Sequence, residues 1–269
     1  MRSRICGTGS ALPEKIVTND DLSQIMDTSD EWIRSRTGIE RRHLAVEETL
    51  TSLAVQAAEN ALKEAGMQAD ALDMIIAATL SADKICPSLS CELQRELGAV
   101  NAVAFDINAA CSGFMIALQT ADAYIRCGQY KNILIVGGEI LSKLMDWHDR
   151  STCVLFGDGA GAAVVTADET CGILGSVQGS DGAKGEALCC ENRKNNNPYV
   201  SNKSVPSYVS MNGQEVYKFA VRTVPKAIEE AIKKAGLTVE DIDLFVIHQA
   251  NIRIIESVSK RLKVPMEKF

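Results

Sequence analysis

Hydrophobic positions along the chain recur with two spacings, one typical of helices and one of buried strands. Apolar residues at helical spacing predict helices over 49–65, 88–97, 111–127, 214–235 and 251–262. Compact apolar runs predict strands over 73–79, 102–107, 132–138, 160–166 and 243–247. Because helices and strands alternate, the predicted class is α/β. Pro225 falls inside the fourth helix, where its missing N–H predicts a kink or a break.

One pattern of helix, glycine turn, acidic turn and strand occurs twice. AENALKEAGMQADALDMIIAA (58–78) aligns without a gap on IEEAIKKAGLTVEDIDLFVIH (228–248), with Gly66 on Gly236 and Asp73 on Asp243. Shared helical patterning is one explanation, and internal duplication is the one we favour. Duplication predicts two similar lobes, over 1–170 and 171–269. Few residues follow the second copy, so the second lobe is expected to be incomplete, truncated at its C-terminus.

Composition narrows the classes of function. With 269 residues and 46% hydrophobic content, the chain can build a large core. Its net charge of -7 argues against a general nucleic-acid or membrane-surface binder. The odd number of scattered cysteines, without CxxC pairs, indicates a reducing cytoplasm. No signal-peptide pattern or membrane-length apolar run occurs, so a soluble, unprocessed cytoplasmic protein is expected.

A cysteine stands where a predicted strand meets a predicted helix, in AFDINAACSGFMIALQTA (104–121). At a helix N-terminus, free N–H groups and the helix dipole favour an anion, and for Cys111 that anion is a thiolate. The small neighbours Ala109, Ala110, Ser112 and Gly113 would let a substrate carbonyl approach. A buried, inert thiol is the alternative. The position favours a nucleophile.

A nucleophilic cysteine needs an imidazole partner, and the chain has three histidines. His43 and His148 lie in charged or polar segments, whereas His248 ends the apolar run LFVIHQAN. Strand ends of α/β sheets are where ligands bind. A structural hydrogen-bonding role for His248 is the alternative to catalysis.

Four segments together resemble one enzyme family. DTSDEWIRSRTGIERRH (27–43), DINAACSGF (106–114), FGDGAGAAV (156–164) and VIHQANIRII (246–255) are similar to β-ketoacyl-acyl-carrier-protein synthase III, the initiating condensing enzyme of fatty acid synthesis. The resemblance implies a thiolase-like duplicated layered α/β/α/β/α fold. It implies that an acyl group, typically from acetyl-CoA, moves to Cys111, and that malonyl-acyl-carrier protein then loses carbon dioxide and attacks the thioester.

The same resemblance implies that His248 stabilises the enolate formed on decarboxylation. The family's second enolate donor is an asparagine of a GN-S/T motif that has no counterpart here, and Asn251 does not match it. The catalytic set is therefore expected to be incomplete.

Binding residues are predicted partly from spacing. Thr28 and Glu31 have the spacing of a capping box, and Trp32 and Arg36 follow one turn apart on one face. An indole beside a guanidinium can hold a nucleobase, and a surface Trp packed on an Arg stem is the alternative. The resemblance implies that Thr28, Trp32 and Arg36, with Arg150, bind the adenine end of CoA.

Further binding residues follow from the resemblance. It implies a pantetheine tunnel lined by Phe156, Met211, Gly213, Ala250 and Asn251. Cys86 departs from the family pattern, because the best-known members carry Phe at this acyl-pocket position, which leaves chain-length preference open. The basic residues predicted to dock the acidic carrier protein, with salt-sensitive attraction, are Lys218, Arg253, Lys260 and Arg261.

Two other motifs are set aside. The glycines of FGDGAGAAVV lead into a strand and not a helix, which argues against NAD, and the vicinal Cys189 and Cys190 lack the second ligand pair of a zinc site. We expect no metal and no cofactor beyond the CoA and carrier-protein substrates, and a homodimer by resemblance. The alternatives are a polyketide-priming condensing enzyme with another starter and a catalytically impaired acyl-CoA-binding remnant.

Overall fold

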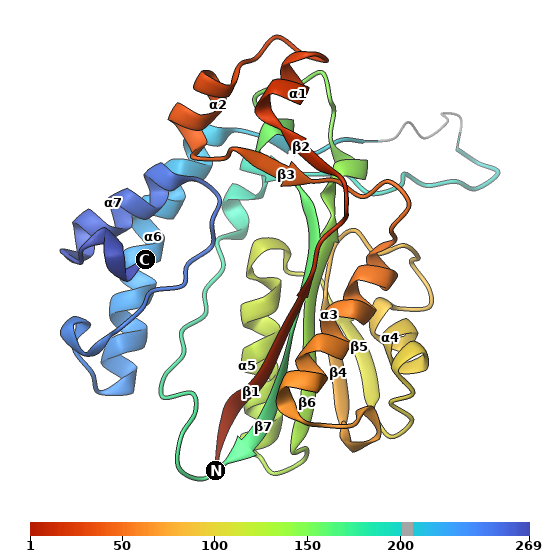
Figure 1. The fold of residues 1–269 in the computed structure, drawn as a ribbon, viewed down its shortest axis with the longest axis vertical. Coiled ribbons are helices and arrows are strands. Elements are labelled where there is room, and N and C mark those ends of the chain that lie inside the picture. Colours follow the sequence, from red (N-terminus) through yellow and green to blue (C-terminus); the bar gives the residue numbers. More distant parts are fainter. Residues whose placement is uncertain (201–206) are drawn as a thin grey trace. The chain divides into compact units, whose positions relative to one another are not determined.

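A computed structural model describes residues 1–200 and 207–269 (Figure 1). The chain forms two compact units, each gathering segments that are distant in sequence. The first consists of Met1–Ile16, Arg42–Ile140 and Gly157–Ser176, and the second of Val17–Arg41, Leu141–Phe156 and Val177–Phe269. The lobe boundary between residues 170 and 171 stays a prediction. Each unit is described here by itself.

A five-stranded sheet forms the centre of the first unit, in the order β1-β7-β6-β4-β5. Its strands are β1 (Arg2–Ala11), β4 (Met74–Ala78), β5 (Val103–Ile107), β6 (Asn132–Ile140) and β7 (Asp158–Asp168). β4 is parallel to both β5 and β6, whereas β7 is antiparallel to β6 and to β1. The carboxyl ends of β5, β4 and β6 therefore share one edge of the sheet.

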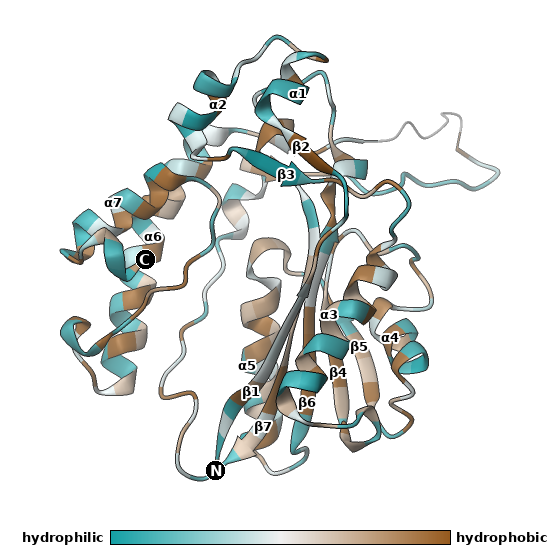
Figure 2. Cartoon of the chain, viewed as in Figure 1, coloured by the Kyte–Doolittle hydropathy of each residue, from teal (hydrophilic) through white to brown (hydrophobic). Residues whose placement is uncertain are grey.

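Helices cover both faces of this sheet (Figure 1). One face packs against α3 (Leu50–Ala65) and α4 (Leu89–Leu97), and the other against α5 (Gly113–Arg126). β4 is buried at every position, which explains its unbroken apolar run; Figure 2 shows it largely in brown. The unit is thus one helix–sheet–helix sandwich, and the buried apolar area of its two faces supplies its main stabilisation.

The second unit is mainly helical. Its helices are α1 (Asn19–Ser23), α2 (Asp30–Thr37), α6 (Gly213–Ala235) and α7 (Ile252–Leu262), and β8 (Leu188–Cys189) pairs with β9 (Ser210–Met211). α6 and α7 share an apolar cluster with buried Phe245, Ile254 and Val258. The short strands β2 (Ile16–Thr18) and β3 (Arg41–His43) pair with each other, and the sequence boundary between the two units falls inside each of them.

Short 3₁₀ helices complete both units. They are η1 (Ala69–Ala71), η2 (Ala110–Ser112), η3 (Leu141–Leu144), η4 (Cys153–Leu155), η5 (Gly182–Ala187), η6 (Val239–Asp241) and η7 (Met266–Lys268).

The duplicated segment has the same backbone motif in both copies. Gly66 ends α3 and Gly236 ends α6, with φ values of 63° and 73°. Each glycine is a left-handed cap, and the residue after it donates back to the helix, at Leu62 in the first copy and Ile232 in the second. η1 then follows the first helix, and η6 follows the second.

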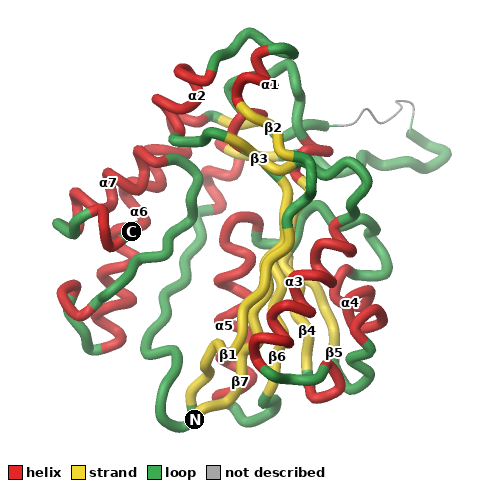
Figure 3. Tube along the Cα trace, viewed as in Figure 1, coloured by secondary structure: helices red, strands yellow, loops and turns green. Residues whose placement is uncertain are grey.

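The two copies differ in what comes after this motif. β4 follows η1 as a central strand, but residues 243–247 form no strand and Figure 3 draws this segment as loop. The strand prediction there is wrong. Phe245 is buried on the α6–α7 cluster, whereas Leu244 and Val246 are exposed, so the segment packs on one side without a neighbouring strand.

The other predicted elements are confirmed to within about two residues, except that Pro225 does not split α6. Val221 and Val224 before the proline and Ile228 after it all pack against the α6–α7 cluster, which holds the helix together across the missing N–H. The helix predicted after Asp27 is confirmed as α2, whereas β1, β2, β3, α1, β8 and β9 have no counterpart among the predicted elements.

Candidate active site

The predicted nucleophile lies at the shared carboxyl edge of the parallel strands. Cys111 is in η2, which follows the end of β5 after two residues and leads directly into α5. Ala110 has a φ of 45°, a left-handed conformation that costs a non-glycine residue on the order of 1–3 kcal/mol. Gly113 allows close packing, because a Cβ there would lie 3.0 Å from the Cβ of Ala78 at the end of β4. A strained turn and a close approach thus fix the cysteine.

The thiol of Cys111 has a raised pKa. Cys111 keeps exposed surface, but protein atoms on its other sides remove water, and this desolvation is the largest cause of the shift. The backbone N–H of Cys111 lowers the pKa, and the negative charge of Glu139 raises it. The expected stabilisation of a thiolate is therefore outweighed, because desolvation and a nearby carboxylate exceed the helix-end effect. At neutral pH the group is a thiol that must give up its proton to react.

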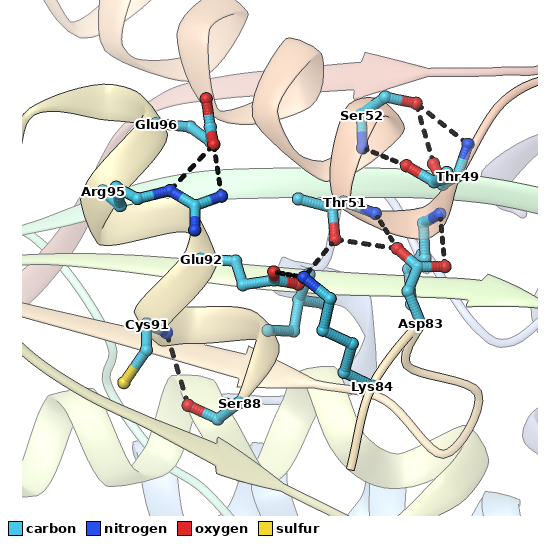
Figure 4. Close-up of polar contacts among 12 residues, drawn as sticks. Thr49, Thr51, Ser52, Asp83, Lys84, Ser88, Cys91, Glu92, Arg95 and Glu96 are labelled. Carbon is cyan, nitrogen blue, oxygen red and sulfur yellow. Dashed lines mark hydrogen bonds and ion pairs between the residues drawn. The ribbon is translucent and has the colours of Figure 1, made fainter. Parts of the chain in front are cut away.

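The loop between β4 and α4 is attached to two helices, α3 and α4, through two adjacent residues (Figure 4). Asp83 accepts hydrogen bonds from the N–H groups of Leu50, at 3.1 Å, and Thr51, at 2.8 Å, at the start of α3. Lys84 pairs with the buried carboxylate of Glu92 on α4. The exposed Cys86, which departs from the family pattern, lies in the same loop, two residues after Lys84.

The predicted nucleotide-binding residues come together in the second unit. The guanidinium carbon of Arg36 lies 4.7 Å from the Trp32 ring centroid, and that of Arg150 lies 5.2 Å away. Arg150 also donates to the carbonyl oxygen of Asp27 and pairs with its carboxylate at 3.2 Å. Two guanidinium groups on one indole form a cationic aromatic platform suited to a phosphorylated nucleobase ligand. Sequence reasoning missed Asp27, although it opens the DTSDEW motif.

The cap of α2 differs from the predicted capping box. Ser29 is the N-cap, and its hydroxyl accepts from the N–H of Trp32 at 3.1 Å. The helix begins one residue later than Thr28 requires, so Trp32 and not Glu31 occupies the third helical position. Among the described residues, the Thr28 hydroxyl has no hydrogen-bond partner.

The predicted tunnel residues also lie in the second unit, on several elements. Met211 is in β9 and Gly213 is the first residue of α6, while Phe156 directly follows η4. Ala250 and Asn251 precede α7, and the Asn251 side chain caps that helix by accepting from the N–H of Arg253 at 2.9 Å. Each residue thus stands at the end of an element.

His248 lies on the irregular segment between α6 and α7. It keeps exposed surface, but desolvation by its surroundings lowers its pKa. The neutral imidazole, one nitrogen of which carries a proton, is therefore the form present at pH 7. Cys111 belongs to the first unit and His248 to the second.

The predicted docking cations lie on α6 and α7. Lys218 pairs with Glu215 at 2.9 Å, and Arg253 donates to the carbonyl of Ser35 at 2.9 Å. Lys260 and Arg261 are exposed in the last turn of α7.

The described residues contain neither a metal-binding cluster nor a membrane-spanning helix. Over the described residues, His, Cys, Asp and Glu side chains form no group of three or more that could hold a metal ion. Likewise, no described helix has the length and apolar character to cross a membrane.

Comparison with known proteins places this site in a family. The family model for 3-oxoacyl-[acyl-carrier-protein] synthase III matches residues 105–182, which include Cys111, and the model for its C-terminal part matches 232–269, which include His248. The β-ketoacyl-[acyl-carrier-protein] synthase III of Clostridium acetobutylicum is 49% identical over 266 residues, covering 98% of this chain and 82% of that protein. The chain belongs to the 3-oxoacyl-[acyl-carrier-protein] synthase III family. The predicted class, a condensing acyltransferase of fatty acid synthesis, is confirmed.

Solved structures of this family confirm the thiolase-like fold. The synthase III of Aquifex aeolicus has a TM-score of 0.92 at 46% identity and covers 99% of this chain and 82% of its own. The priming β-ketosynthase of the R1128 polyketide pathway has a TM-score of 0.91 at 39% identity, covering 98% and 79%. The compared proteins pair with nearly all of this chain, and the chain spans 79–82% of their length. The truncation expected from the repeat stays a prediction.

Proposed function

We propose that the protein joins a short acyl group from acyl-CoA, with acetyl-CoA as the first candidate, to malonyl-acyl-carrier protein. The products are a 3-oxoacyl-acyl-carrier protein, CoA and carbon dioxide. The observation that carries this proposal is the position of Cys111, on a strained turn at the carboxyl edge of the sheet, within the segment that matches the family model.

The reaction has two stages. The Cys111 sulfur attacks the acyl carbonyl, a new C–S bond forms, and CoA leaves as its thiol. In the second stage the malonyl C–C bond to the carboxylate breaks and carbon dioxide leaves. The resulting enolate, held by the neutral His248 N–H, attacks the acyl-Cys carbonyl and the cysteine sulfur leaves.

The two ends of CoA are proposed to bind different residues of the second unit. Trp32, Arg36, Arg150 and Thr28 would hold the nucleotide end of CoA, and Phe156, Met211, Gly213, Ala250 and Asn251 its pantetheine arm. No cofactor beyond these substrates is invoked.

Truncating the indole tests the nucleotide site. Trp32→Ala should weaken acyl-CoA binding by roughly 1–3 kcal/mol, because the base would lose its stacking surface. Isothermal titration with acetyl-CoA measures this change. Arg36→Ala should also weaken binding, whereas Arg34→Ala, on the same helix but paired with Glu40 at 2.6 Å, serves as the matched control. A folded Trp32→Ala protein with the wild-type dissociation constant would refute the assignment.

The carrier protein is proposed to dock on the basic residues Lys218, Arg253, Lys260 and Arg261. Reversing the two exposed charges together, as Lys260→Glu with Arg261→Glu, should raise KM for malonyl-acyl-carrier protein about tenfold at low salt, and added salt should shrink the difference. Steady-state kinetics at several ionic strengths measure this effect. Lys63→Glu with Arg95→Glu, an equal charge change on exposed side chains of α3 and α4, is the control. Equal effects of both variants would exclude this docking surface.

A homodimer is part of the proposal. Within the part of the chain that the structure describes, β5 is an edge strand paired with β4, and Val103 on it is 50% exposed. An open, partly apolar edge favours pairing with a second copy. Sedimentation equilibrium at micromolar concentration tests this oligomeric state.

A cytoplasmic location is also proposed, because all nine cysteines are free, as expected in a reducing compartment.

A polyketide-priming role is the second candidate, favoured by the likeness to the R1128 priming ketosynthase. The two candidates differ in the starter acyl group. Product analysis with acetyl-CoA, propionyl-CoA and longer acyl-CoA donors separates them, because fatty acid initiation by an acetyl-CoA-using enzyme predicts 3-oxobutyryl-acyl-carrier protein as the main product. Loss of all turnover with normal acyl-CoA binding would favour an acyl-CoA-binding remnant.

A further inference from the structure

A half-buried carboxylate lies next to the end of β6, at the same edge of the sheet as Cys111. Glu139 accepts hydrogen bonds from the Leu80 N–H at 3.0 Å, the Thr79 hydroxyl at 3.2 Å and the Ser81 hydroxyl. Thr79 and Ser81 are themselves buried, at 7% and 3% exposure. One carboxylate therefore holds three consecutive residues of the turn that follows β4.

This turn is connected to the nucleophile through short contacts. The Thr79 N–H donates to the carbonyl of Ile107 at 3.1 Å, and Ile107 is the last residue of the strand that leads to Cys111. Ala78, just before the turn, packs on Gly113 at the start of α5. A shift of the turn would therefore move both chain segments that flank Cys111.

The Ser81 hydroxyl forms two hydrogen bonds to the end of β6. The Ser81 hydroxyl donates to Glu139 and accepts from the N–H of Ile140 at 2.9 Å. Desolvation raises the pKa of the Glu139 carboxyl, and the hydrogen bonds from Ser81, Leu80 and Thr79 offset part of that shift by favouring the charged form. An apolar residue in its place would leave buried hydroxyl and N–H groups without their acceptor.

Glu139 is also the charged side chain that acts on the Cys111 thiol. The other charged groups at this end of the first unit are held elsewhere: Asp83 by the start of α3, Asp106 by the N–H groups of Leu89 and Ser90, Asp158 by the Ala45 N–H, and Lys84 by Glu92. None of these four contributes to the shift at Cys111.

We infer that Glu139 is a positioning residue, which fixes the turn Thr79–Ser81 against the strand end leading to Cys111 and places a carboxyl group at the same sheet edge as the nucleophile. The inference rests on the proposed role of Cys111. When ionised, Glu139 adds to desolvation in keeping the resting sulfur as a thiol, which protects it from oxidation, because the thiolate is the reactive form. The acylated sulfur is neutral as well, so the carboxylate does not oppose the acyl-enzyme.

Iodoacetamide labelling, which needs no substrate, tests the charge. Alkylation of each cysteine is followed by peptide mass spectrometry from pH 6 to 10 in wild type and Glu139→Gln. The Cys111 profile should move to lower pH, and its rate at pH 7 should rise about twofold or more, because a repulsive charge is gone. Cys127, exposed at the other end of α5, is an internal reference that should not change.

Asp73→Asn is the matched control for loss of a carboxylate. Asp73 accepts from the N–H groups of Lys131 and Asn132, at 2.8 and 2.9 Å, at the amino end of β4. Its removal costs stability in the same sheet without touching the nucleophile, so the Cys111 profile should stay at the wild-type position. A Glu139→Gln profile that coincides with that of Asp73→Asn would overturn the inference.

Ser81→Ala tests positioning and keeps the charge. It removes the hydroxyl bridge, so the high-pH limiting alkylation rate of Cys111 should change severalfold while the midpoint of its profile stays in place. If Glu139→Gln does not fold, an unchanged limiting rate in Ser81→Ala refutes positioning by itself. A wild-type protein that alkylates at Cys111 but takes no acyl group from acetyl-CoA would contradict the proposed function and leave this inference standing.

Discussion

Replacing Cys111 by alanine is expected to abolish transfer of a labelled acetyl group from acetyl-CoA to the protein. The strained turn at Ala110 and the close packing of Gly113 on Ala78 hold this sulfur at the sheet edge. A neighbouring hydroxyl cannot replace it, because a thioester needs a sulfur atom. Labelled acetyl-CoA followed by peptide mapping measures the loss. Wild-type labelling should rise with pH, because the raised pKa of Cys111 makes the thiolate scarce at pH 7.

The control uses a cysteine at the far end of α5, the helix that follows Cys111. Cys127→Ala removes an exposed thiol at the end of α5 and should leave labelling intact. Label that persists in Cys111→Ala at wild-type stoichiometry, on any of the remaining cysteines, would show that the nucleophile has been assigned to the wrong residue.

His248→Ala is expected to separate the two stages of the reaction. Acetylation of Cys111 should continue, whereas decarboxylation of malonyl-acyl-carrier protein should slow by about a hundredfold or more, because the enolate loses a positioned donor. Stopped assays for each stage, with labelled acetyl-CoA and with labelled malonyl-carrier protein, measure the two rates. Desolvation lowers the pKa of His248, so the imidazole should stay neutral down to a pH below the ordinary histidine range, and decarboxylation should depend little on this group above it.

His148→Ala is the matched control, because that imidazole is exposed on a loop of the same unit. It should leave both stages at the wild-type rate. Equal losses of acetylation and decarboxylation in His248→Ala would point to general unfolding or to a different role, and thermal unfolding of the variant distinguishes these two outcomes.

Local patterns predicted most of the fold because local forces determine those elements. The glycine caps at Gly66 and Gly236 and the fully buried run of β4 can each be read within a few residues. The failure at residues 243–247 has the opposite cause: a strand needs a partner, and apolar alternation cannot reveal whether one is present. β1, polar at several positions and paired with β7 from the far end of the unit, was missed for the same reason.

The candidate site divides in a similar way. Trp32 and Arg36 are one helical turn apart, so their contact could be predicted, and α2 places them together with Arg150. The contribution of Glu139 could not be predicted, because it depends on a hydrogen bond from Ser81, which is 58 residues away along the chain. Its only signal is a carboxylate after the glycines of GGEIL, at the end of an apolar strand. The prediction of a thiolate at Cys111 is wrong. The position before a helix favours an anion, but desolvation, which only a folded structure reveals, raises the pKa of the thiol.

Single turnover of a preformed acetyl-enzyme tests the central claim most directly. The protein is acetylated with labelled acetyl-CoA, freed of excess donor and mixed with malonyl-acyl-carrier protein. The proposed reaction predicts that label leaves Cys111 and appears in 3-oxobutyryl-acyl-carrier protein, with one carbon dioxide released for each acetyl group consumed. Label that remains on the protein, or that leaves only as free acetate, would contradict it.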